Sequence, residues 1–520
     1  MNDIPLTTPH GVIACGHPVT ADAAADVLRS GGNAFDAIVA AYFTTCVAET
    51  VFASIGSGGY ALVETTEGNS RVYDFFVQTP SQWTADDVDF FPIEADFGTT
   101  TQEFHIGTGA AAVPGAVRGV FELHRDLGSI PMRELMAPAI HAAQQGVEIT
   151  PLQASLFKIL TPIYLNTPRM RALFEDPDQP GETFKAGHVI VQSDLANTLE
   201  ALANEDDGLF YEGELGRLIV DFCQSRGGHI RVDDLKNYQV KKLDPIIAHY
   251  RNAELLAPPP SSSGGLLIAF ACELLQSIPN IPDINSAEHL ALLAHAMDVT
   301  NLARHEVHLD EEQHPNVERI LDSEFVTRYQ KEIQGRASCL RGTTHMSVAD
   351  TAGNIASMTV SNGEGCGYLV PDTGIILNNM LGEEDINPTG FFNAPNNQRM
   401  TSMMSPTIVN FDNGRRVAMG SGGSNRIRTA ILQVINRLVD YDMSLSDAIN
   451  APRIHFERGL LSVEPGFDQQ VTDQLQQQFE NCQLWDQQNL YFGGVHAVMT
   501  NNGQLSGAAD PRRGGVSLVV

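Results

Sequence analysis

The sequence contains few cysteines and few basic residues, and each shortage excludes common classes of protein. Its 7 cysteines, spread over 520 residues, include no pair in CxxC spacing, so they predict neither a disulfide framework nor a zinc or redox motif. Lysine and arginine total 32 against 63 aspartates and glutamates, which gives a formal net charge of -31. A field of that sign repels nucleic-acid phosphates and anionic membranes. We therefore expect no nucleic-acid partner and no membrane partner.

Long hydrophobic runs are also missing. The most apolar early segment, residues 37–48, lies between Asp36 and Glu49 and is shorter than the roughly 20 residues that a helix needs to cross a bilayer. The segment predicts a buried helix instead. Residues 1–9 lack the basic start and apolar stretch of a secretory signal, so we expect a cytoplasmic protein.

What the sequence does contain is typical of a folded protein with mixed secondary structure. Hydrophobic residues make up 43% and charged residues 18% of the chain, which argues against disorder and coiled coil. Helical spacing dominates the part before residue 342, as at 20–29 and 286–303, and indicates a helix-rich region. Short alternating runs follow at 345–348, 355–360, 375–377 and 407–409, and these predict strands.

The junction between the two regions carries the first chemical signal. Gly342 stands directly before Thr343 at the start of an expected strand. The threonine hydroxyl can attack the carbonyl of Gly342, and the flexible glycine relieves strain in the resulting ester. Hydrolysis of that ester would free the amine of Thr343, whose pKa lies nearer neutrality than that of lysine, so the amine can act as the general base. The pair predicts self-cleavage, although the spacing alone also fits an ordinary strand start.

A hairpin after Thr343 supplies a second hydroxyl. Residues 350–354, Asp-Thr-Ala-Gly-Asn, separate two alternating runs and predict a hairpin centred on Ala352. In that register Thr343 lies opposite Ser361. The serine hydroxyl can then hold the oxygen of Thr343 in orientation, while a threonine–serine pair at the end of a sheet is also a common surface feature.

A glycine-rich loop is a candidate for binding negative charge. Residues 420–426, Gly-Ser-Gly-Gly-Ser-Asn-Arg, precede an apolar helix expected at 427–439. Backbone N–H groups of such a loop, next to the positive N-terminus of a helix, can form an oxyanion hole. A glycine turn before a capped helix has the same pattern, so both interpretations stay open from the loop alone.

Motifs along the whole chain resemble those of the gamma-glutamyltranspeptidase family of N-terminal nucleophile hydrolases. Residues 343–348, Thr-Thr-His-Met-Ser-Val, resemble the start of that family's small subunit, and its Asp-x-x-Gly-Asn turn follows at 350–354. The other similar segments occur in the family's order, and they are 31–37, 113–115, 258–265, 374–379, 404–407, 450–453 and 509–512.

The resemblance implies an α+β fold, the four-layer αββα sandwich. A large fragment, 1–342, and a small fragment, 343–520, would form one intertwined body. Thr343 would take the acyl group of a small amide donor as an ester, and water or an amine would remove it, with no cofactor and no metal. Ser361 falls where the family has a supporting threonine, and Gly422 and Gly423 fall on its oxyanion glycines.

The resemblance also implies a substrate pocket that is partly preserved. Glu383 stands where the family has an aspartate for the α-amino group of a gamma-glutamyl donor. Asn362 and Ser402 match two further polar positions of that pocket. We therefore expect a binding site for a cationic amine.

The carboxylate end of the same pocket departs from the family. Phe76 stands where the family has the arginine that binds the α-carboxylate, Met403 replaces a serine, and Met380 replaces a glutamine. Losing a bidentate arginine weakens the binding of a carboxylate by orders of magnitude unless another cation replaces it. Arg399 and Arg426 are the alternative cations in the sequence.

Three functions remain compatible with these residues. The leading hypothesis is a glutathione hydrolase or gamma-glutamyltransferase, which follows from the overall resemblance. The second is an acylase or amidase for a less charged acyl group, which Phe76, Met380 and Met403 favour. The third, of another class, is an unprocessed and inactive scaffold, which would run as one band on a denaturing gel where an active enzyme shows two.

Overall fold

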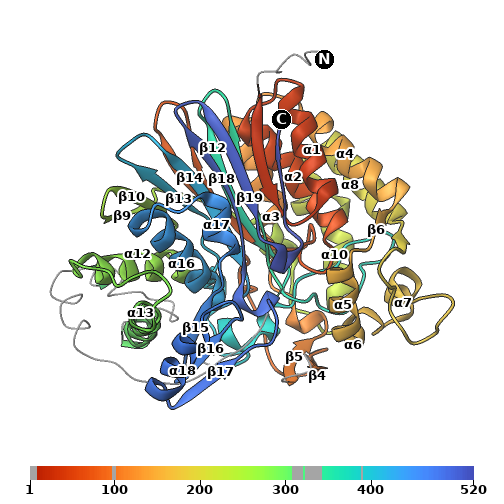
Figure 1. The fold of residues 1–520 in the computed structure, drawn as a ribbon. Coiled ribbons are helices and arrows are strands. Elements are labelled where there is room, and N and C mark those ends of the chain that lie inside the picture. Colours follow the sequence, from red (N-terminus) through yellow and green to blue (C-terminus); the bar gives the residue numbers. More distant parts are fainter. Residues whose placement is uncertain (1–8, 97–100, 307–319, 322–341, 388–389) are drawn as a thin grey trace.

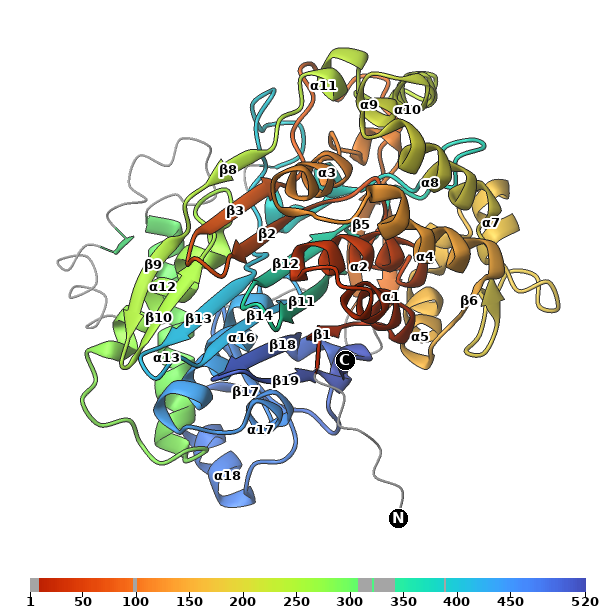
Figure 2. The ribbon, with the colours of Figure 1, turned by 90° about the horizontal axis from the view of Figure 1, so that it is seen from above.

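Two β-sheets lie face to face at the centre of the molecule, and helices cover the outer face of each sheet (Figures 1 and 2). The structure is a computed structural model, and it describes residues 9–96, 101–306, 320–321, 342–387 and 390–520. This arrangement is the αββα sandwich that the resemblance implied, so the predicted fold class is confirmed.

The Gly342–Thr343 junction lies directly before one strand of the first sheet. All of its neighbouring strands are antiparallel. Its seven strands, in spatial order, are β20 (Val516–Val519), β1 (Gly11–Cys15), β11 (Thr344–Asp350), β12 (Ile355–Ser361), β2 (Gly58–Glu64), β3 (Ser70–Phe75) and β8 (Lys241–Leu243). Strands from before and after residue 342 alternate in this order, so the two fragments would share the sheet.

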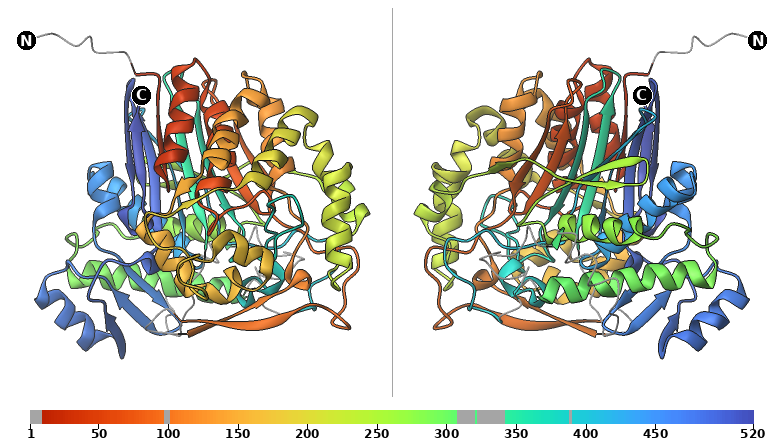
Figure 3. Two further views of the ribbon diagram at one scale, coloured as in Figure 1. Left: turned by 90° about the vertical axis from the view of Figure 1, so that its right-hand side faces the viewer. Right: turned by 90° about the vertical axis from the view of Figure 1, so that its left-hand side faces the viewer.

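The second sheet is also antiparallel and also mixes both parts of the chain. Its six strands, in spatial order, are β19 (Gln504–Ala509), β18 (Gly494–Asn501), β14 (Arg416–Gly422), β13 (Thr407–Phe411), β10 (Ala253–Ala257) and β9 (Ile246–Tyr250). Figure 3 shows the same layers from the right-hand and the left-hand side of Figure 1.

Helices on each side complete the layers. The first sheet is covered by α1 (Pro18–Arg29), α2 (Ala34–Ala48) and α3 (Ala116–Leu127), with α4 (Met132–Gln145) and α8 (Ser193–Glu205) packed outside them. The second sheet is covered by α12 (Ser263–Gln276), α16 (Arg426–Asp440) and α17 (Leu445–Asn450), with α13 (Ala287–Glu306) packed on α12. Every residue of α2 is buried, which confirms the buried helix predicted at 37–48.

Smaller elements surround the two sheets. They are β4 (Phe91–Asp96), β5 (Thr101–Ile106), β6 (Val147–Glu148), β7 (Val189–Ile190), β15 (Ile454–Glu457), β16 (Leu460–Val463), β17 (Asn481–Leu484), α5 (Pro151–Ile159), α6 (Thr161–Tyr164), α7 (Pro168–Phe174), α9 (Gly208–Tyr211), α10 (Glu214–Gln224), α11 (Val232–Lys236) and α18 (Gln469–Gln478). Among the described residues, no helix combines the length and the apolar character needed to cross a membrane.

Burial on both faces explains why several strands of the two central sheets could not be recognised in the sequence. Residues between the sheets are small or branched and fully buried, among them Val12, Ala14, Leu62, Ala418 and Val498. Strands covered on both sides lack the alternation of polar and apolar residues that marks a strand with one exposed face. The description of residues 1–342 as helix-rich is therefore incomplete, because this part also contains β1 to β10. The strand expected at 375–377 is wrong, since those residues form only isolated bridges.

Candidate active site

Thr343 stands directly before β11, deep inside the sandwich. The hairpin of β11 and β12 pairs Thr344 with Val360 and Ala349 with Ile355, and the same register continued by one residue sets Thr343 opposite Ser361. Both side chains are about 95% buried. The predicted hairpin is confirmed, and it brings two hydroxyl groups together at the end of the central sheet.

The two hydroxyls surround the carbonyl of Gly342. Ser361 Oγ donates a hydrogen bond to Gly342 O at 2.7 Å, and Thr343 Oγ1 lies 2.8 Å from the same oxygen. The two hydroxyl oxygens are 3.4 Å apart, so the predicted contact between them exists but is the longest of the three. Gly363 N donates to Ser361 Oγ at 3.1 Å. Because Ser361 accepts from Gly363, its own hydrogen is directed at the carbonyl that Thr343 would attack.

We predict that Ser361→Ala lowers kcat by about 10- to 100-fold without unfolding the protein, since the lost hydroxyl orients the reacting groups and is not consumed. Ser361→Thr keeps the hydroxyl and should keep most of the rate. Steady-state kinetics on one amide donor compares the three proteins. An alanine variant as fast as the parent would show that this hydroxyl has no part in the reaction.

A cavity beside Thr343 collects six of the nine residues singled out in the sequence. Its lining includes Thr343, Ser361, Phe76, Glu383, Ser402 and Met403. The other three, Asn362, Gly422 and Gly423, do not line it. Glu383 follows a short 3-10 turn, η2 (Met380–Gly382), and Met380 also lines the cavity.

Gly422, at the end of β14, lies against the main chain of Thr343. A Cβ atom at this position would clash with the Thr343 carbonyl oxygen, so glycine allows the second sheet to approach Thr343. Gly423 follows with φ of 123°, a conformation that favours glycine. The placement of Gly422 beside Thr343 agrees with the family motif, and the role of both glycines as an oxyanion hole stays a prediction.

Arg513 also binds the main chain of Thr343. Its Nη1 donates to the Thr343 carbonyl oxygen at 3.1 Å, and burial lowers the pKa of the guanidinium to about 10. Arg513 ends η5 (Pro511–Arg513), the 3-10 turn before β20. This hydrogen bond holds the main chain of Thr343 at the start of β11.

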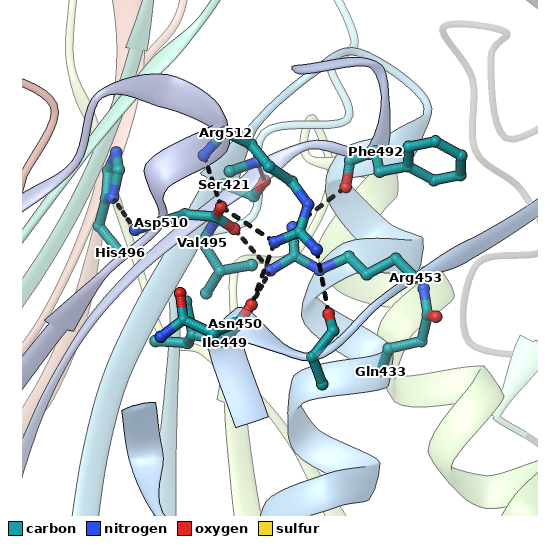
Figure 4. Close-up of polar contacts among 12 residues, drawn as sticks. Ser421, Gln433, Ile449, Asn450, Arg453, Phe492, Val495, His496, Asp510 and Arg512 are labelled. Carbon is teal, nitrogen blue, oxygen red and sulfur yellow. Dashed lines mark hydrogen bonds and ion pairs between the residues drawn. The ribbon is translucent and has the colours of Figure 1, made fainter. Parts of the chain in front are cut away.

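A buried ionic network holds this turn in place (Figure 4). Asp510 pairs with Arg453 Nη2 at 2.6 Å and with Arg512 Nη1 at 3.1 Å, and it accepts a hydrogen bond from Val495 N at 3.0 Å. Arg512 also pairs with Glu464 at 2.5 Å. Removing one partner of a fully buried ion pair is strongly destabilising. The network therefore holds the turn, and with it Arg513, in a fixed position.

Neither cation proposed as a substitute for the missing arginine lines the cavity. Arg399 pairs with Asp74 at 3.2 Å and donates to Tyr238 Oη and to the carbonyl of Gln239. Arg426 is fully buried and donates to the Tyr491 carbonyl at 3.2 Å.

Phe76 itself is 1% exposed and stacks on Tyr60, with ring centroids 5.7 Å apart. The wall of the cavity at Phe76 is therefore apolar.

Glu49 is a buried acid that contacts Thr344, the residue after Thr343. Its Oε2 accepts a hydrogen bond from Thr344 Oγ1 at 2.8 Å, and burial raises the pKa of its carboxyl from 4.5 to about 7. The folded protein thus keeps a proton that the unfolded chain loses between these two pH values. The stabilisation that comes from binding this proton in the folded state is complete below pH 4.5 and is lost as the pH rises through 7.

We therefore predict that Glu49→Gln becomes more stable relative to the parent as the pH increases from 5 to 8, by about 3 kcal/mol at most. Thermal unfolding of both proteins at the two pH values gives the difference in Tm. A difference that does not change with pH would show that Glu49 ionises normally.

Three residues near Thr343 escaped the sequence analysis: Glu49, Glu364 and Arg513. Arg513 directly follows the matched segment 509–512, so the motif itself was the signal. Glu49 appeared only as the polar boundary of an apolar segment. Glu364 carried no signal, because its position relative to Thr343 depends on the turn after β12.

The αββα sandwich, with a threonine directly before a central strand, places this chain in the fold class of the N-terminal nucleophile hydrolases. The gamma-glutamyltranspeptidase family model matches residues 20–520. This chain belongs to that family, whose enzymes catalyse amide hydrolysis and acyl transfer.

Three similar proteins illustrate the family. An Acylase ACY 1 proenzyme of Pseudomonas sp. (strain V22) is 30% identical over 99% of this chain and 94% of its own length. A glutathione hydrolase proenzyme of Bacillus subtilis (strain 168) is 29% identical over 98% and 91% of the two chains. The crystal structure of cephalosporin acylase from Bacillus halodurans superimposes with a TM-score of 0.84 at 25% identity, and covers 100% of this chain and 98% of its own.

Proposed function

We propose that this protein cleaves its own chain between Gly342 and Thr343 and then hydrolyses amides whose acyl group lacks an α-carboxylate. It is thus an acylase rather than a strict glutathione hydrolase. The observation that carries the choice of donor is the apolar wall of Phe76, Met380 and Met403, together with the pairing of Arg399 with Asp74.

The self-cleavage step uses only groups at the junction. Thr343 Oγ1 attacks the Gly342 carbonyl carbon, the C–N bond breaks, and the hydroxyl proton passes to the nitrogen, which becomes the free amine of Thr343. Water then hydrolyses the ester and leaves a carboxylate on Gly342. The contacts of Ser361 and Thr343 with the Gly342 carbonyl support this step. The similar acylase of Pseudomonas and the similar glutathione hydrolase of Bacillus subtilis are both named as proenzymes.

The same threonine then acts on a donor. Its free amine takes the hydroxyl proton, and the oxygen attacks the donor carbonyl to form an ester. The leaving amine departs with the proton, and water releases the acid. A donor carboxylate directed at the Phe76 wall would lose its water without gaining a cation, which costs binding.

Glutathione hydrolysis is the second candidate, and two observations favour it. Glu383 lines the cavity at the position expected for an amine-binding acid, and Arg304 of α13 lines the same cavity. A pocket with both signs of charge suits a donor that carries an amine and a carboxylate.

A matched pair of chromogenic donors separates the two candidates. Gamma-glutamyl p-nitroanilide and 4-aminobutyryl p-nitroanilide place the amine at the same distance from the carbonyl and differ only in the carboxylate. We expect kcat/KM for the 4-aminobutyryl donor to equal or exceed that for the gamma-glutamyl donor. A clear preference for the gamma-glutamyl donor would identify a glutathione hydrolase instead.

A further inference from the structure

The uncleaved chain places its own acyl group beside Thr343. Gly342 supplies the carbonyl that the hydroxyl would attack, and Ser361 Oγ donates to it at 2.7 Å. Under the proposed function the same hydroxyl later attacks a donor, so the donor carbonyl must come to about the same place. Groups that now contact Gly342 are therefore expected to contact the first atoms of a donor's acyl group.

One of these groups is a buried carboxylate. Glu364 Oε1 accepts a hydrogen bond from Gly342 N at 3.0 Å, and Glu364 is only 4% exposed. The nitrogen is bonded to the α-carbon of Gly342, which is the first carbon after the carbonyl. Glu364 thus contacts a nitrogen on the α-carbon of the acyl group.

The main chain fixes this carboxylate relative to the reacting groups. Glu364 N donates to Asn379 Oδ1 at 2.9 Å, and Gly363 N donates to Ser361 Oγ. Gly363 has φ of 62°, and a Cβ atom there would clash with Asn379 Oδ1 and Glu383 Oε1. Gly363 is therefore the centre of a group formed by Ser361, Glu364 and Glu383. The two glutamates of this group favour the binding of a cationic amine.

We propose that Glu364 recognises an amino group on the α-carbon of the acyl donor, so that the preferred substrates are α-aminoacyl amides. This inference rests on the proposed function and narrows its substrate class. A gamma-glutamyl donor carries its amine on the third carbon from the carbonyl, beyond the position that Glu364 marks. An α-amine replaces the N–H of Gly342 and adds a charge, and hydrogen bonds to charged groups are the stronger ones.

Four p-nitroanilides test the position of the amine in the purified, processed protein: glycyl, β-alanyl, 4-aminobutyryl and acetyl. We expect kcat/KM for the glycyl donor to exceed that for the acetyl donor by about 10- to 100-fold, with the β-alanyl and 4-aminobutyryl donors in between. A glycyl donor no better than the acetyl donor would overturn the inference and leave the proposed function intact. If none of the four is hydrolysed, the proposed function itself fails.

Two glutamine variants test the residue. Glu364→Gln should reduce the ratio of glycyl to acetyl kcat/KM at least tenfold. Glu384→Gln, which removes an exposed charge directly after Glu383 in the chain, should leave the ratio unchanged. An unchanged ratio in Glu364→Gln would overturn the assignment. If this variant is not processed, the ranking of the four donors by the parent protein still decides the question.

Discussion

Replacing Thr343 by alanine is expected to leave the purified protein as one chain of 520 residues and to abolish amide hydrolysis. The variant keeps Gly342 and the surrounding hydrogen-bond partners but lacks the oxygen that attacks, so neither the ester of self-cleavage nor the acyl-enzyme can form. The parent should separate into fragments of about 342 and 178 residues. A denaturing gel and a donor assay measure both effects together.

Thr351→Ala is the matched control, because Thr351 is an exposed threonine in the turn of the same hairpin. It should be processed and active like the parent. Two bands from the Thr343 variant would mean that another residue, or a contaminating protease, cuts the chain. One band from the parent would leave the inactive scaffold as the better description of this protein.

Replacing Phe76 by arginine is expected to restore preference for a gamma-glutamyl donor. Phe76 lines the cavity with Met380 and Met403, so a guanidinium there can reach the substrate and bind its carboxylate in two places. Such a pair should change the ratio of kcat/KM for the gamma-glutamyl donor over the 4-aminobutyryl donor by about 10- to 100-fold.

Phe76→Leu controls for the loss of the ring, since it keeps the wall apolar and should keep the preference of the parent. If Phe76→Arg folds, is processed and shows the parent ratio, the α-carboxylate binds elsewhere. Arg304 would then be the first residue to examine, because it lines the same cavity.

Local patterns predicted what depends on neighbours in the chain. The hairpin around Ala352 follows from two alternating runs and a turn, and it correctly set Thr343 opposite Ser361. The helices at 20–29, 286–303 and 427–439 were also correct to within a few residues. Each of these helices could be recognised because its pattern of apolar residues depends only on residues close together in the chain.

Contacts between residues far apart in the chain could not be predicted from the sequence. Nothing near Arg399 indicates that its guanidinium would be bound to Asp74, more than 300 residues away. The contact of Arg513 with Thr343 likewise depends on how β14, β18 and the last turn pack. The same holds for β2, where burial on both faces removes the alternation that predicts a strand.

Both proposed reactions require that the bond between Gly342 and Thr343 breaks and that Thr343 becomes the new N-terminus. N-terminal sequencing of the smaller fragment of the purified parent protein determines whether this happens. We expect a single sequence beginning Thr-Thr-His-Met-Ser-Val, as at residues 343–348. A fragment that begins at any other residue, or a parent protein that remains one chain, would contradict it.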